Sequence, residues 1–523
     1  MKNSSFVPPH DWLREDQPAE TGLSFGFLFG SMVLAAILRF YRLDGPSLWV
    51  DEILTWNMIR PDRDLNLLGQ VWVAIQAPLY LLVVWPLMRI QENEWMMRLP
   101  AAVIGTITVP FFGILLGRIL DHRSARLGTL LLAISPFHVW YSQEGRGYSF
   151  LVFFVVLMAL AYLEMVQNRP RPGVALALAV AGACAVLSNM SALFLLFAMG
   201  LSVLLLHRPK HLGQWTLWGL ALGGAVLLTL PWILKASGIW AVDRILPGVD
   251  TGMALRGQST FSLMAIPYSV FTFFFGHSFG PSLRELHQPD RMMVLKANLP
   301  LLVAGAVPVG LGLLSSLRHL GSRRLFLLIF VAVPMAVLAI LAMRNIKPWN
   351  PRYVSVVFPF LLILLSLGLT RLPGNWSRGG AILMIMLSFW SLAGHYWNER
   401  YVKADMRSAV HFVEANNPSA EPILIPVVTG VYSFYDQAAV ELIDTFDQAP
   451  LDSQEAAATF FQNSLARHRS FWFVSSREWY FDPHGHLPVA LTRNGHLRLE
   501  KELPGVKIYH WENQIQSGFN HER

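Results

Sequence analysis

The sequence predicts an α-helical protein that crosses a membrane many times and carries a small α/β domain after its last crossing. Of its 523 residues, 54% are hydrophobic and only 14% are charged, whereas about a quarter of an ordinary soluble domain is charged. Uncharged runs recur that are long enough to cross a hydrocarbon core of about 30 Å. After residue 398 the pattern changes to short amphipathic and strand-like segments, which predict a separate folded domain.

The uncharged runs define about eleven transmembrane helices. The run 173–206 is too long for one span, and we expect it to turn near Ser188 and Asn189 and to form two short spans. The first run follows a polar segment and no small-residue cleavage site follows it, so residues 21–40 are expected to be an uncleaved signal anchor. The first span lies in the uncharged run 21–38, and the other spans are expected within 99–117, 127–143, 147–163, 212–234, 297–317, 325–343, 353–370 and 379–398.

The net charge of +7 comes from basic residues in short connectors between spans. This distribution follows the positive-inside rule and argues against a nucleic-acid partner, since no basic domain is present. Cys184 is the only cysteine, which excludes disulfides and thiolate metal sites. The connectors predicted to be cytoplasmic are 118–126, 167–172, 207–211, 318–324 and 371–378.

The alternate connectors must then face outward, together with everything after residue 398. This parity leaves no room for a crossing by 71–90, which contains Gln76, Pro78 and Pro86; we expect it to lie in or dip into the outer interface, because proline breaks helix hydrogen bonds. The predicted domains are a membrane domain over 1–398, whose first outer loop is 43–98, and an extracytoplasmic α/β domain over 399–523. The other outward connectors are 144–146, 188–189, 235–296 and 344–352.

The first outer loop carries two adjacent carboxylates in "SLWVDEILTW". Asp51 and Glu52 lie between Trp49 and Trp56, and tryptophans are typical of a membrane interface. The pair has two readings that the sequence leaves open. The carboxylates either cap a helix or take part in chemistry just outside the membrane.

A second polar cluster is the segment "YSQEGRGYS", with Glu144 and Arg146 at the outer end of a span. One turn of helix before it is expected to bring His138, Tyr141 and Ser142 to a common face. Glu144 and Arg146 either form a structural ion pair or face a polar site.

The segment "RNIKPWNPRYVS" has Arg344, Lys347 and Arg352 and no acid, although it is predicted to face outward. An outward anion such as a lipid phosphate would explain this exception to the positive-inside rule, since arginine binds phosphate oxygens bidentately. The alternative for each cation is snorkelling to the interface. A weaker fourth cluster is "LMAIPYSVFTFFFGHSFG", which is expected to dip into the interface and to present His277.

These motifs together resemble those of a known family. "LDGPSLWVDEILTW", "QAPLYLLVVW", "RLPAAVIG", "ISPFHVWYSQEGRGYS" and "NPRYVSVVFPFLLILLSLGL" occur in the order seen in polytopic C-type (GT-C) glycosyltransferases, the group that contains protein O-mannosyltransferases and lipid A aminoarabinose transferases. The resemblance spans most of 40–370. It implies a multipass hexosyl- or pentosyltransferase that takes a sugar from a polyprenyl-phosphate carrier.

The resemblance also implies roles for individual residues. Asp51 matches the acid proposed as general base, and Glu52 and Glu144 match acids that line the donor and acceptor site. In some relatives such acids bind a divalent metal, here Mg²⁺ or Mn²⁺, and no organic cofactor is expected. Arg146 and Arg352 would face the donor phosphate, with Arg344 and Lys347 nearby, and the further candidates are His138, Tyr148 and His277. In "QAPLY", Gln76 and Ala77 stand where many relatives have a proline, histidine or basic residue.

The expected chemistry suits these residue types. A carboxylate can take the proton of an acceptor hydroxyl, and cations can stabilise a leaving phosphate. The expected partners are the lipid-linked donor, a glycan, lipid or protein acceptor, and the bilayer. The expected location is the inner (cytoplasmic) membrane, with the site facing the periplasm.

Two alternatives stay open. One is a membrane transporter, although the spans are nearly free of charge and no inverted repeat is visible. The other is a polymerase or ligase of lipid-linked glycans. In the tail, "DMRSAVHFVEANN" predicts an amphipathic helix, and "PILIPVV", "SFWFVSS" and "GVKIYHW" predict strands.

Overall fold

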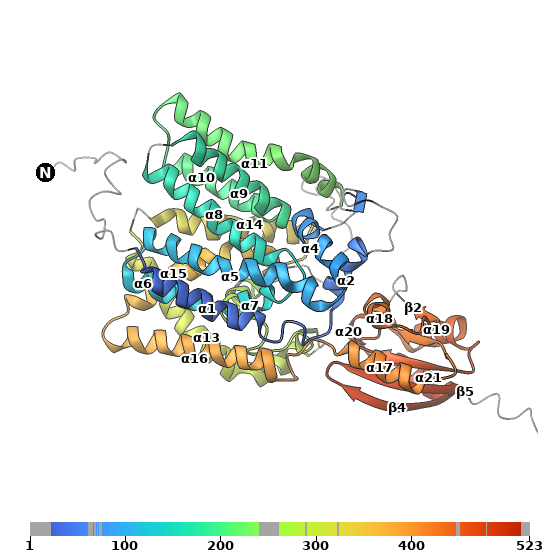
Figure 1. Ribbon diagram of the computed structural model, residues 1–523. Helices are drawn as coiled ribbons and strands as arrows, with labels where there is room; N and C mark the ends of the chain where they lie inside the picture. The colour runs from blue at the N-terminus through green and yellow to red at the C-terminus, as the bar shows by residue number, and fades with distance from the viewer. Residues whose placement is uncertain are drawn as a thin grey trace, which may run out of the picture. The chain divides into compact units, whose positions relative to one another are not determined.

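The computed structural model describes residues 22–60, 66, 69–70, 72, 76–168, 170–239, 261–287, 290–321, 324–445, 450–476 and 478–513. They pack into two compact units (Figure 1). The first, here called the membrane unit, runs to residue 43 and includes 58–280 and 297–393. The second, the C-terminal unit, combines 44–57, 281–296 and 394–523. This division differs from the predicted one at 398, because the segments 44–57 and 281–296 pack with the tail.

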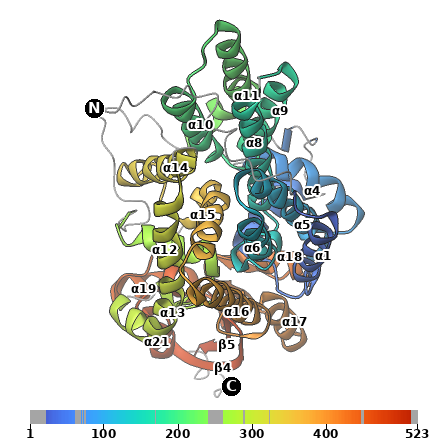
Figure 2. The same cartoon turned by 90° about the vertical axis from the view of Figure 1, so that its left-hand side faces the viewer.

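The membrane unit is helical, and its helices lie side by side as a bundle (Figure 2). Seven helices of the described residues are long and apolar enough to cross a membrane: α5 (Glu94–Ile119), α8 (Tyr148–Gln167), α11 (Leu212–Ile239), α13 (Arg291–His319), α14 (Leu325–Met343), η5 with α15 (Pro351–Val357 and Phe358–Thr370) and α16 (Asn375–Trp397). Shorter apolar helices are α1 (Phe25–Phe40), α4 (Pro78–Ile90), α9 (Pro172–Ser188), α10 (Ala192–Leu206) and α12 (Ala265–Phe275). The multispan prediction is confirmed, whereas the count of eleven stays a prediction.

The expectation of one continuous span over 127–143 is wrong. Helix α6 (His122–Ala133) ends before Ser135, and α7 (Pro136–Ser142) begins after it. Pro136 has no N–H to donate to the Leu132 carbonyl, so the ladder is interrupted there. The Ser135 hydroxyl caps the new helix by accepting the His138 N–H at 3.2 Å. The break leaves carbonyl groups of α6 in need of other partners.

Two local predictions can be compared with helix boundaries. The expected turn near Ser188 and Asn189 is confirmed, since α9 ends at Ser188 and α10 begins at Ala192. Within 71–90 the described helix α4 has 13 residues, or about 20 Å at 1.5 Å per residue, which is too short for a 30 Å core. Residues 71 and 73–75 lie outside the described chain.

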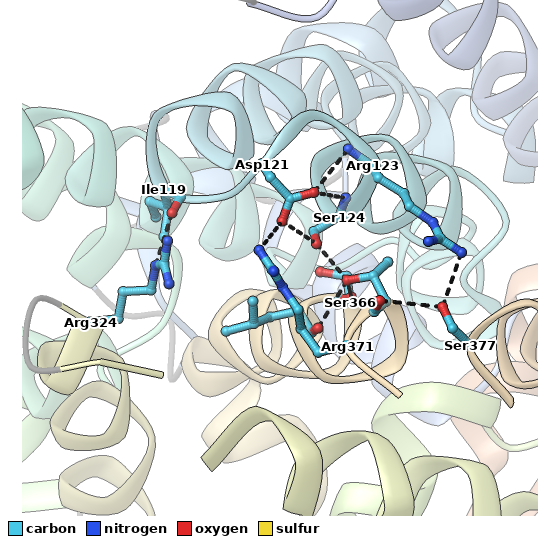
Figure 3. A network of polar contacts seen from close by, with 10 residues as sticks. Ile119, Asp121, Arg123, Ser124, Arg324, Ser366, Arg371 and Ser377 are labelled. Atoms are coloured by element: carbon cyan, nitrogen blue, oxygen red, sulfur yellow. Dashed lines mark hydrogen bonds and ion pairs between the residues drawn. The ribbon is translucent and has the colours of Figure 1, made fainter. Parts of the chain in front are cut away.

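The five connectors predicted to be cytoplasmic lie at one end of the bundle. Figure 3 shows three of them joined: Arg371 pairs with Asp121 at 3.1 Å, Arg123 donates to the Ser377 hydroxyl at 3.1 Å, and Arg324 donates to the Ile119 carbonyl at 3.0 Å. The end of α8, which leads into connector 167–172, pairs with Arg118 through Glu164 at 3.0 Å. Tyr162 of α8 makes a ring contact with His207 of connector 207–211. Arg169 and Arg323 lie outside the described residues. A common end agrees with the predicted parity, while its cytoplasmic orientation stays a prediction.

The C-terminal unit contains a five-stranded sheet in the order β2-β1-β3-β5-β4. Strands β1 (Ile423–Ile425), β2 (Leu442–Asp444) and β3 (Ser470–Ser475) are parallel, and β5 (Val506–Asn513) pairs antiparallel with β3 and β4 (Gly495–Leu503). Phe412 of α17 (Met406–Asn416) contacts Trp472 on one face, and the core on the other face is formed with α19 (Gln454–Phe460), η6 (Phe461–Leu465) and α21 (His486–Asn494). The predicted α/β class, helix α17 and strands β1, β3 and β5 are confirmed. The sequence reading missed β2 and β4.

Candidate active site

The break between α6 and α7 is held by a buried arginine of α1. The Arg39 guanidinium, with no exposed surface, donates to the Ala133 carbonyl at 2.9 Å and to the Leu132 carbonyl at 3.2 Å. It also approaches Nδ1 of His138 at 2.7 Å. Because arginine stays protonated, His138 must accept this bond at Nδ1 and carry its proton on Nε2. His138 is therefore a buried partner of α1, while Tyr141, one turn later on the same short helix, contacts His277.

A return contact fixes the end of α7. The Gln143 amide nitrogen donates to the carbonyls of Arg39 at 3.0 Å and Tyr41 at 2.8 Å, at the C-terminal end of α1. Arg39 thus caps α6, and Gln143 caps α1. Such terminal carbonyls have no partner within their own helix. Because residue 144 directly follows Gln143, this reciprocal cap also fixes its position.

Glu144 follows directly and is fully buried, whereas Arg146 is half-buried. The turn is tight: the Arg146 N–H donates to the Glu144 carbonyl at 2.7 Å. A Cβ at Gly147 would lie 2.8 Å from the Ser188 carbonyl oxygen, which explains the glycine. This tight turn therefore fixes the backbone from which the Glu144 carboxylate projects.

Tyr141, Tyr148 and His277 meet beside this turn. The Tyr141 hydroxyl lies 3.3 Å from Nε2 of His277, and the rings of Tyr141 and Tyr148 are 4.8 Å apart. The Trp140 ring packs against His277 at 5.2 Å. The structure therefore brings the sequence-predicted Tyr148 and His277 together.

The cationic connector is organised around Tyr353. Arg352 donates to the Tyr353 hydroxyl at 3.2 Å, and Nζ of Lys347 lies 4.5 Å from the centre of the Tyr353 ring. The Asn350 side chain caps η5 by accepting the Arg352 N–H at 3.1 Å. Arg344 follows the end of α14 and is half-buried. A tyrosine thus positions two of the three cations of this connector.

Contacts from α12 join this connector to the α7 turn. The Trp349 indole donates to the Ser269 hydroxyl of α12 at 2.9 Å. Phe137 of α7 lies 5.0 Å from Phe273 of α12 and 5.2 Å from Phe358 of α15, between ring centres. The two predicted polar segments of the membrane unit therefore rest on one aromatic cluster.

The acid pair belongs to the C-terminal unit, at the start of α2 (Val50–Ile59). Glu52 has no exposed surface; it lies 3.4 Å from Nζ of Lys403 and accepts the Trp49 N–H at 3.3 Å. This reach back to the first N–H of a helix is the glutamate half of a capping box. Asp51 is half-buried in the first turn. The helix-capping interpretation thus applies to Glu52, and Asp51 is the more accessible carboxylate.

Contacts from the tail hold this segment in place. The Leu48 N–H donates to the Tyr435 hydroxyl at 2.7 Å, and the Ser47 hydroxyl donates to Asp405 at 3.1 Å. Among the described residues no group of three His, Cys, Asp or Glu side chains converges as metal ligands. The divalent cation stays a prediction. The positioning residues that the sequence reading missed are Arg39, Gln143, Tyr353 and Lys403.

The chain has the fold of the polytopic C-type membrane glycosyltransferases, as its motifs predicted. Residues 75–234 match the family model for dolichyl-phosphate-mannose-protein mannosyltransferases. No curated protein sequence matches the chain.

The particular structures that it resembles include ArnT from Cupriavidus metallidurans. The apo state is 15% identical, with 93% of this chain and 98% of that chain covered and a TM-score of 0.51. The form bound to undecaprenyl phosphate has the same identity and coverage and a TM-score of 0.52. The oligosaccharyltransferase AglB from Archaeoglobus fulgidus, in complex with an inhibitory peptide and a dolichol-phosphate, is 12% identical at 95% and 75% coverage, with a TM-score of 0.48.

Proposed function

We propose that this protein transfers a sugar from a polyprenyl-phosphate carrier to an acceptor hydroxyl on the extracytoplasmic side of the inner membrane. The observation that carries the proposal is the fold shared, over almost the whole chain, with an ArnT structure bound to undecaprenyl phosphate. The matched segment 75–234 also contains the buried Glu144 turn.

In the proposed reaction the acceptor oxygen forms a bond to the anomeric carbon of the sugar. The bond from that carbon to the phosphate oxygen breaks, and its electron pair leaves with the polyprenyl phosphate. Asp51 takes the proton of the acceptor hydroxyl, a role worth roughly 10²–10⁴ in rate. A leaving group that is already anionic needs no separate general acid.

The cations of the membrane unit would receive the donor phosphate. Arg146 and Arg352 are assigned to its oxygens, with Lys347 and Arg344 adding positive charge, because charge develops there as the bond breaks. Tyr353 would keep Arg352 and Lys347 on one side of the phosphate. Tyr148 and His277 would border the sugar.

The carboxylates of Asp51, Glu52 and Glu144 supply hard oxygen ligands that suit Mg²⁺ or Mn²⁺. A bound cation would add positive charge beside the donor. To bind a cation, Glu52 would have to give up part of its contact with Lys403. We therefore assign two roles to Glu52, which stabilises the first turn of α2 and contributes an oxygen ligand to the site.

The test is a comparison of lipid-linked sugars from cells with and without this protein. We expect one polyprenyl-phosphate monosaccharide to accumulate in the deletion strain, and the purified protein to release free polyprenyl phosphate from it. Accumulation of a whole lipid-linked glycan would favour the polymerase or ligase alternative. Unchanged lipid pools, with a solute that no longer crosses the membrane, would favour a transporter.

A further inference from the structure

The C-terminal unit contains a cavity that lies apart from every residue assigned above. Its volume is about 250 Å³. Pro426, which follows β1, and Ser475, the last residue of β3, lie at its edge, and Phe473, Tyr509, Lys507 and Asp482 also line it. The cavity therefore opens at the carboxyl ends of two neighbouring parallel strands.

The sheet topology makes this edge a favoured place for a ligand. The chain runs from β1 through α18 (Thr429–Tyr435) to β2 on one side of β1, and then returns through α19 and η6 to β3 on the other side. Helix α18 packs with α17, whereas α19 packs with α21 and η6. Strand order thus reverses between β1 and β3. In open α/β sheets, ligands bind outside the carboxyl ends of the strands at such a switch point.

The floor of the cavity is aromatic, with Phe473 buried and Tyr509 half-buried. Phe473 of β3 pairs across the sheet with Tyr509 of β5, and their rings are 5.6 Å apart and nearly parallel. Phe481 and Leu487 also line the cavity and are 2% and 0% exposed. An apolar floor of this kind suits the C–H face of a ring rather than an extended polar chain.

The rim carries a small set of polar groups. Ser475 and Lys507 are directly paired on neighbouring strands, and because side chains alternate between faces they lie on the same face as Phe473 and Tyr509. Asp482 is 6% exposed and accepts the N–H groups of His486 at 2.7 Å and Leu487 at 2.8 Å, which fixes its carboxylate at the start of α21. Lys507 lies 3.9 Å from Glu502 in a mostly exposed pair, which is worth little. A hydroxyl-bearing ligand would therefore meet both a donor and a fixed acceptor.

We propose that this cavity binds a single sugar ring, as part of the acceptor or its glycan. The aromatic floor would take the apolar face of the ring, and Lys507, Ser475 and Asp482 would take its hydroxyls or an acidic substituent. Small pockets with an apolar lining and a few placed polar groups are typical ligand sites. The choice of a sugar rests on the proposed function, whereas the binding test does not require turnover.

The test uses the full chain in nanodiscs free of glycolipid, because maltoside detergents would themselves offer a sugar. Saturation-transfer NMR with D-glucose, D-galactose, D-mannose and D-galacturonate, each at millimolar concentration, is expected to show transfer to at least one of them. Stronger binding of galacturonate than of galactose would indicate that the natural ligand is an acidic sugar. Equal binding of the two would indicate a neutral sugar. If none of the four receives saturation, the proposal is overturned, even in a protein that transfers sugar.

Matched variants locate the binding. Lys507→Met is expected to raise the dissociation constant of the sugar roughly tenfold, because it removes a charged hydrogen bond. Lys501→Met, on the adjacent strand and outside the cavity, is the control and should bind as the unchanged protein does. Ser475→Leu fills the cavity and should abolish the signal while the protein remains folded. Equal binding by the unchanged protein and both cavity variants would place the sugar elsewhere and sink the proposal.

Discussion

Nη2 of Arg39 lies 2.7 Å from Nδ1 of His138, inside a helix bundle where neither side chain reaches the surface. The arginine also bonds the carbonyl groups that the α6 break leaves open. Its charge is therefore spread over main-chain oxygens and one neutral imidazole.

The first prediction concerns this contact. Arg39→Leu should destabilise the protein by about 2–4 kcal/mol, because it removes the donor to the buried Ala133 carbonyl and to Nδ1 of His138, each at a cost of about 1–3 kcal/mol. Thermal unfolding of the purified protein measures the effect. Arg39→Lys should recover part of it, and Arg378→Gln, exposed on α16, is the control. A melting temperature unchanged in Arg39→Leu would contradict this account.

The second prediction concerns Asp51. Asp51→Asn keeps the size and the capping ability of the side chain but removes the proton acceptor, so turnover should fall by roughly two to four orders of magnitude. The affinity for the lipid-linked donor should stay the same. Near-normal turnover by the purified variant would leave Asp51 as a structural residue.

The third prediction separates the two roles of Glu52. Both Glu52→Gln and Lys403→Met should lower stability by about 1–3 kcal/mol, since each leaves a buried charge without its partner. If Glu52 also acts in the site, kcat of Glu52→Gln should be lower than kcat of Lys403→Met at a temperature where both variants are folded. Equal kcat values in the two variants would restrict Glu52 to holding α2.

The fourth prediction concerns the donor phosphate. Arg352→Ala should raise the donor KM about tenfold or more, because a charged hydrogen bond contributes about 1.5–3 kcal/mol. Tyr353→Phe removes the hydroxyl that accepts from Arg352 and should have a smaller effect in the same direction. Arg318→Ala, in a connector at the opposite end, serves as control. A donor KM that does not change in a correctly inserted Arg352→Ala protein would argue for snorkelling.

The fifth prediction concerns pH. Burial opposes ionisation of Glu285, but hydrogen bonds from Arg400 and Ser282 outweigh it and lower the pKa below its ordinary 4.5. The pair at 2.8 Å therefore adds stability above that pH and loses it as the pH falls through the lowered value. Because the pair is partly exposed, Glu285→Gln should cost only about 0.5 kcal/mol at neutral pH. Unfolding curves should converge with those of the unchanged protein in acid; a constant difference at all pH values would contradict this.

The sequence predicted the class of fold because long apolar runs and basic connectors are local signals. It also predicted the tail strands whose residues alternate or are mostly apolar. It could not predict that Arg39 is buried, since an arginine after an apolar run is usually an interfacial residue. Its partners become available only because Pro136 breaks a helix almost a hundred positions later.

The acid pair shows the same limit. Adjacent acids near a helix start predict capping or chemistry; the Trp49 N–H assigns capping to Glu52, and Lys403 balances its buried charge. A partner so distant in sequence leaves no periodic pattern. In the same way, the sequence shows Tyr353 only as the neighbour of Arg352, whereas the structure places Nζ of Lys347 over its ring.

The composition of the C-terminal unit has a consequence for how the chain matures. Its three segments, 44–57, 281–296 and 394–523, leave the ribosome at widely separated times. Lys403 and Tyr435, which hold the acid pair, are among the later residues to be made. During synthesis the nascent chain can insert its helices while Asp51 and Glu52 still lack their supports. The segment that carries the acid pair can therefore reach its final packing only after residues 403 and 435 have been made.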